Sequence, residues 1–99
     1  MHPVTNKVRR LRFGLIGAGR IADSYVQAFR AASNATLVAV ADTREDAARA
    51  MAEAAGCPSF PSHRQMLEQV ECDAVVVATP PASHPDICMD ALRRKLHVL

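Results

Sequence analysis

Two glycines and an alanine near the start of the chain, Gly17, Gly19 and Ala22, follow the spacing G-x-G-x-x-G/A. They come directly after the apolar segment 11–16, and apolar side chains recur at helical spacing after them. The first glycine allows a tight turn, the second lets a pyrophosphate approach the main chain, and the small third residue lets a helix pack on a strand. Free N–H groups at the start of that helix would bind phosphate oxygens. The spacing therefore predicts a dinucleotide-binding turn formed by Gly17, Ala18, Gly19, Arg20 and Ile21.

A carboxylate follows at the distance that such a turn requires. Asp42 stands at the end of the apolar run 36–41, roughly twenty residues past the glycines. In this position an acid accepts hydrogen bonds from the adenine ribose and repels a 2′-phosphate, which favours NAD over NADP. Arg44 could instead pair with a 2′-phosphate, so NADP stays an alternative, or it could be an exposed first-turn residue. We expect Asp42, Thr43 and Arg44 to contact the cofactor, although Asp42 could simply end a strand and cap the next helix.

Five apolar segments alternate with segments of helical periodicity. The expected strands cover residues 11–16, 36–41, 57–60, 74–78 and 96–99. This alternation is typical of an α/β fold, and right-handed crossovers then give a doubly wound parallel sheet, a Rossmann fold, in the order 3-2-1-4-5. Ligands bind where that order reverses, so Ala78, Thr79 and Pro80 should lie on the same rim as the glycine turn.

Some side chains can also be placed on the expected helices. Tyr25 and Leu92 fall on apolar faces and should point inward. Thr43 is expected to begin a helix with a capping box, and Ser62 to cap the next one. His63 is then most simply a surface first-turn residue.

The length and composition indicate one small domain. The polar, basic residues 1–10 are expected to form a disordered leader, and residues 11–99 the domain. Neither cluster of basic residues is interleaved with aromatics, and no apolar run reaches membrane-spanning length, so we expect no nucleic-acid or membrane partner. The cysteines are three and widely spaced, and the histidines show no ligand spacing, which predicts reduced thiols, a cytoplasmic location and no metal.

The pattern from Arg12 onward resembles the amino-terminal domain of the Gfo/Idh/MocA oxidoreductases, the glucose–fructose oxidoreductase and inositol dehydrogenase superfamily. The segments that carry the resemblance are 13–22, 37–42, 72–80, 83–84 and 91–99. The most specific are the Ala-Thr-Pro turn at 78–80, with His84 four residues after the proline, and the closing Lys-x-His-Val-Leu.

The resemblance implies a fold and a reaction. Family members bind NAD or NADP in this domain, and a second α/β domain carries most of the substrate site. Hydride passes between the nicotinamide and a carbinol carbon of a sugar, cyclitol or related polyol. The family's catalytic lysine lies in a Glu-Lys-Pro motif just after the His-Val-Leu strand. The sequence ends at Leu99, so we expect no catalytic residue within it and no turnover by these residues alone.

The resemblance also implies roles for particular residues. Ala78, Thr79 and Pro80 would line the nicotinamide-side ribose and the pyrophosphate, with His84 near that rim. His84 could otherwise be only a first-turn or capping residue. Arg94 stands where the family often has glycine, so we expect the last helix to end without a left-handed residue. The full-length protein is expected to be a homo-oligomer.

Two other functions fit the same residues. One is a non-catalytic, dinucleotide-sensing regulatory protein of the same superfamily, and the other is a different Rossmann dehydrogenase that resembles dihydrodipicolinate reductase. For the 99 residues alone, the open sheet edge at 96–99 predicts marginal stability and a tendency to associate.

Overall fold

A parallel sheet of five strands forms the middle layer of the protein. The computed structural model describes residues 10–79 and 84–99, apart from the side chains of Arg20 and Ile21. The strands are β1 (Leu11–Ile16), β2 (Ala35–Ala41), β3 (Ser59–Phe60), β4 (Ala74–Val77) and β5 (His97–Val98). They lie in the order β3-β2-β1-β4-β5 and all neighbours are parallel, which confirms the predicted doubly wound topology.

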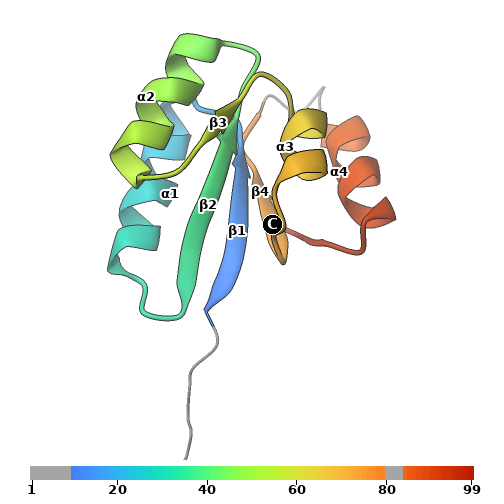
Figure 1. Ribbon diagram of the computed structural model, residues 1–99, viewed down its shortest axis with the longest axis horizontal. Coiled ribbons are helices and arrows are strands. Elements are labelled where there is room, and N and C mark those ends of the chain that lie inside the picture. Colours follow the sequence, from blue (N-terminus) through green and yellow to red (C-terminus); the bar gives the residue numbers. More distant parts are fainter. Residues whose placement is uncertain (1–9, 80–83) are drawn as a thin grey trace, which may run out of the picture.

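Helices cover both faces of this sheet (Figure 1). On one face lie α1 (Arg20–Ala31) and α2 (Glu45–Ala55), and on the other lie α3 (His63–Gln69) and α4 (His84–Arg93). None of the described helices is long and apolar enough to cross a membrane.

Successive residues of each central strand supply the two cores in turn. Leu15 packs in the core under α1 and α2, whereas its neighbour Ile16 packs in the core under α3 and α4. Val76 and Val75 divide in the same way in β4. Because both faces are covered, the central strands consist of nearly continuous apolar residues rather than alternating ones.

The ends of the helices differ in part from the predictions. Ser62 caps α3 as expected, since its hydroxyl accepts a hydrogen bond from the N–H of Gln65. The prediction for α2 was wrong, because this helix begins one residue later, with Arg44 as its N-cap and no side-chain cap among the described residues. The N–H of Arg44 donates instead to the carboxylate of Asp42, which fixes the main chain just before the helix.

The end of α4 is also different from the prediction. Lys95 adopts a left-handed conformation with φ of 60°. The N–H of Lys95 donates to the carbonyl of Leu92, and the N–H of Leu96 donates to that of Ala91. These two bonds form a Schellman motif, the same arrangement that ends α2 at Gly56. The helix thus ends with a left-handed residue although no glycine is available there.

Two side chains that were expected to point inward are exposed. Tyr25 lies at the border of the buried stripe of α1, which is formed by Ala22, Val26 and Phe29. On α4, Ile87 and Ala91 face the sheet. Leu92 is the next residue along the helix, so its side chain points in a different direction, away from the sheet. The predictions for residues 1–9 lie outside the described part of the chain.

Candidate functional site

The carboxyl ends of three strands are level at one edge of the sheet. Ile16 at the end of β1 pairs with Ala41 of β2 and with Val77 of β4. The N–H of Gly17 donates to the carbonyl of Ala41 over 2.7 Å, and the N–H of Ala78 donates to that of Ile16 over 2.8 Å. These bonds bring the glycine turn, the end of β2 and the end of β4 to a single rim, as the topology predicts.

Gly17 must be a glycine for two separate reasons. Its φ of 111° lies in a region that other residues rarely adopt. A Cβ at this position would also stand 2.7 Å from the carbonyl carbon and oxygen of Ala78 and 3.0 Å from the nitrogen of Thr79. The turn therefore packs directly on the main chain that leaves β4.

The turn leads into the N-terminus of α1. Gly19 is the N-cap residue, and no side chain caps the helix in the described structure. Ala22 is fully buried against the sheet, so the first turn of the helix lies close to β1. N–H groups and the positive end of the helix dipole thus lie beside the rim, where an anion would be stabilised.

Asp42 ties the end of β2 to the glycine turn. Its side chain is 10 % exposed, and Oδ2 accepts a hydrogen bond of 2.7 Å from the N–H of Ala18. Oδ1 accepts one of 2.8 Å from the N–H of Arg44, and the Arg44 guanidinium contacts both oxygens. Burial alone would raise the pKa of this carboxyl. The hydrogen bonds from Arg44 and Ala18 outweigh that effect and lower the pKa, so the group is held ionised.

The guanidinium of Arg44 lies between the carboxylate of Asp42 and the glycine turn. Its Nη2 atom lies 3.2 Å from Oδ2 of Asp42 and 3.6 Å from the place where a Cβ of Gly19 would stand. Sequence reasoning treated Arg44 as a phosphate partner or a surface residue and missed its pairing with Asp42. The spacing Asp-x-Arg at a strand end was the available signal, because the arginine can reach back over one residue.

The third part of the rim is the chain after β4. The Nε2 atom of His84 lies 2.6 Å from the carbonyl oxygen of Thr79. The Thr79 hydroxyl oxygen is buried and has no hydrogen-bond partner among the described residues. Ala78 is half-buried, Thr43 on the opposite side of the rim is exposed, and Pro80 lies outside the described residues.

Two of the cysteines are shielded thiols, and the described residues form no metal centre. Burial raises the pKa of the Cys57 and Cys72 thiols, which keeps them protonated. No group of three or more potential metal ligands occurs within the described ranges.

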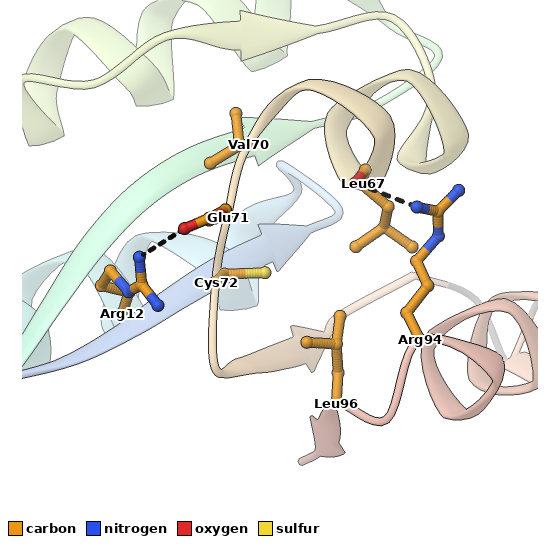
Figure 2. A pocket seen from close by; sticks show the side chains of 7 residues that line it. All are labelled: Arg12, Leu67, Val70, Glu71, Cys72, Arg94 and Leu96. Carbon is orange, nitrogen blue, oxygen red and sulfur yellow. Dashed lines mark hydrogen bonds and ion pairs between the residues drawn. The ribbon is translucent and has the colours of Figure 1, made fainter.

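A groove of about 350 Å³ lies at the opposite end of the sheet, where β1 and β4 begin. Figure 2 shows that its polar groups already have partners: Arg12 pairs with Glu71, and Arg94 donates to the carbonyl of Leu67. The groove therefore adds no group to the rim.

Comparison with known proteins identifies the family of this domain. The family model GFO_IDH_MocA, described as an oxidoreductase family with an NAD-binding Rossmann fold, matches residues 11–99. Inositol 2-dehydrogenase 4 of Saccharopolyspora erythraea is 40 % identical over 93 residues, which are 92 % of this chain and 28 % of that protein. A dTDP-3,4-didehydro-2,6-dideoxy-alpha-D-glucose 3-reductase of Streptomyces antibioticus is 38 % identical and covers 91 % of this chain and 28 % of its own length.

A solved structure agrees with these relatives. The WlbA dehydrogenase from Bordetella pertussis, crystallised with NADH and UDP-GlcNAcA, superposes with a TM-score of 0.86 at 37 % identity. The match covers 91 % of this chain and 28 % of that one. The chain thus spans somewhat more than a quarter of the length of each of these relatives.

Proposed function

The chain belongs to the Gfo/Idh/MocA oxidoreductase family, and we propose on this basis that residues 11–99 are the cofactor domain of a dehydrogenase. The parent protein would transfer hydride between a nicotinamide and a carbinol carbon of a sugar, cyclitol or related polyol. The observation that carries the proposal is the rim itself, where Gly17 packs on the end of β4 and Asp42 bonds to Ala18 of the turn.

In this proposal, each part of the rim binds a different part of the cofactor. The turn from Gly17 to Ile21, with the N-terminus of α1, holds the diphosphate. Asp42 accepts the adenine ribose hydroxyls, flanked by Thr43 and Arg44. The nicotinamide half of the cofactor would be lined by Ala78, Thr79, Pro80 and His84. NAD is the preferred cofactor, because the ionised Asp42 repels a 2′-phosphate.

The proton that accompanies hydride transfer needs a group from elsewhere in the parent protein. Asp42 is held as a carboxylate by Arg44 and Ala18, and Nε2 of His84 is engaged with the carbonyl of Thr79. We therefore propose that the 99-residue chain binds dinucleotide without turnover, and that the substrate domain and the subunit contacts of a homo-oligomer lie in the rest of a cytoplasmic parent.

Calorimetric titration of the 99-residue chain with NAD⁺ and NADH tests this function. We expect saturable binding that weakens about tenfold or more in Asp42→Ala, because charge-assisted hydrogen bonds to the ribose are lost. Glu53→Ala is the matched control, since it removes a carboxylate from an exposed position on α2. Circular dichroism verifies that each variant is folded. A folded wild-type chain that binds neither nucleotide would contradict the proposal, as would NADH production from NAD⁺ and myo-inositol by this chain alone.

A further inference from the structure

Arg44 occupies the space that an adenine ribose needs. In the proposed cofactor site, the ribose must lie between the carboxylate of Asp42 and the glycine turn. The Nη2 atom of Arg44 stands in that space, 3.2 Å from the acid and 3.6 Å from where a Cβ of Gly19 would stand. Ribose hydroxyls can reach Asp42 only after this guanidinium moves away.

The contact that holds Arg44 in place is weak enough to be displaced. The Arg44 side chain is 64 % exposed, and ion pairs with such exposed partners contribute little because water and salt screen them. The main-chain bonds from Ala18 and Arg44 to Asp42 do not depend on the guanidinium. Asp42 therefore keeps its position when the arginine side chain swings out.

A displaced Arg44 remains next to the ribose. Its backbone is the N-cap of α2, two residues after Asp42, so the long side chain can still reach a group bound beside that carboxylate. A guanidinium at this place matches a phosphate group on the ribose 2′-oxygen, with two parallel N–H···O bonds. An unphosphorylated ribose offers no anionic group there, so the arginine gains no ion pair in place of the one that it lost.

We infer that Arg44 is a movable cover of Asp42 that sets the choice between NAD and NADP, with opposite effects on the two cofactors. It competes with the ribose of NAD for Asp42, and it supplies the cation that lets NADP bind beside that acid. This inference rests on the proposed cofactor site and adds a specificity-determining residue to it.

Binding of NAD⁺ and NADP⁺ to wild type and Arg44→Ala tests the inference. We expect the variant to bind NAD⁺ up to about fivefold more tightly, since an exposed ion pair no longer has to be broken. The same variant should bind NADP⁺ about tenfold more weakly, because a charge-assisted contact to the phosphate is lost. The affinity for NADP⁺ in wild type should also fall more steeply with salt than that for NAD⁺.

Two further variants distinguish this role of Arg44 from a general effect of positive charge. Arg49→Ala removes a positive charge from an exposed position on α2 and should leave the ratio of the two affinities unchanged. Arg44→Lys keeps the charge without the planar fork, so NADP⁺ binding should be recovered only in part.

The outcomes distinguish this inference from the function on which it rests. If Arg44→Ala weakens both cofactors, or leaves the affinity for either one unchanged, Arg44 does not act as a cover and the inference is wrong. If wild type binds neither cofactor, the proposed function itself fails.

Discussion

At the scale of single residues, the rim depends on the absence of a side chain at Gly17. Gly17→Ala would place a methyl group 2.7 Å from the Ala78 carbonyl, in a backbone conformation that alanine resists. We expect a loss of at least about 2 kcal/mol of unfolding free energy, measured by urea denaturation.

Gly56 provides the matched control for this substitution. It has φ of 74°, but a Cβ there would meet nothing within 4 Å. Gly56→Ala should therefore cost only the conformational part, about 1 kcal/mol. Equal losses in the two variants would mean that the close approach of Ala78 has no energetic weight.

His84 is expected to act through the main chain of Thr79. A carbonyl oxygen only accepts hydrogen bonds, so Nε2 must carry the proton in this contact. His84→Gln keeps a donor of similar reach and should retain most of the affinity for NAD⁺, whereas His84→Leu should lose several-fold because an uncompensated carbonyl remains. Titration of both variants with NAD⁺ gives the comparison, and equal affinities would show that the contact does not support the site.

At the scale of elements, Asp90 joins α3 to α4. Its carboxylate accepts hydrogen bonds from His63 at 2.7 Å and Arg64 at 3.1 Å, and it pairs with Arg93 at 3.6 Å. The hydrogen bonds from His63 and Arg64 lower the pKa of Asp90, against the opposing effect of burial. His63 was predicted to be a surface first-turn residue. It does begin α3, but its side chain is only 18 % exposed because it bonds to a partner on the other helix.

This pairing predicts a pH-dependent stability. Because the folded pKa is below the unfolded one, Asp90 stabilises the native state above the unfolded pKa of about 3.9, and this contribution disappears as pH falls through the folded value. Asp90→Asn should therefore be less stable than wild type by about 1–2 kcal/mol at neutral pH, and the difference should vanish in acid. Asp86→Asn on the same helix is the control, and a loss that persists in acid would argue against an ionic contribution.

The end of α4 gives a second prediction at this scale. Lys95 has φ of 60°, a conformation that favours glycine. Lys95→Gly should raise the unfolding free energy by about 1 kcal/mol, whereas Lys95→Ala should give no such gain. Thermal unfolding measures both, and equal effects would mean that the conformation of residue 95 is not the cause.

The sequence predicted the elements better than the contacts between them. Buried strands and glycine turns have short-range signatures, so the sheet order and the rim that includes Gly17 and Asp42 could be derived. The pairing of His63 with Asp90 joins residues 27 positions apart, and no local pattern encodes it. The Arg44 cover was missed for another reason: a flexible surface side chain has several partners within reach, and only the folded geometry selects one.

At the scale of the whole molecule, the two edges of the sheet differ in how well they are protected. The edge strand β3 has two residues and follows Pro58, which cannot donate to a neighbouring strand. The other edge strand, β5, pairs only with β4 and has no such protection in the described structure. On α4, which precedes β5 in the sequence, Met89 is 52 % exposed and Leu92 is 58 % exposed.

We therefore expect the 99-residue chain to associate as its concentration rises, through β5 and the outer face of α4. The double variant Met89→Lys/Leu92→Lys should shift the weight-average mass from light scattering toward that of the monomer, because burying two ammonium groups in a contact is unfavourable. Leu11→Lys, at an exposed position on β1, should leave the association unchanged. A wild-type chain that stays monomeric at all concentrations and melts sharply would show that this edge is protected by the fold itself.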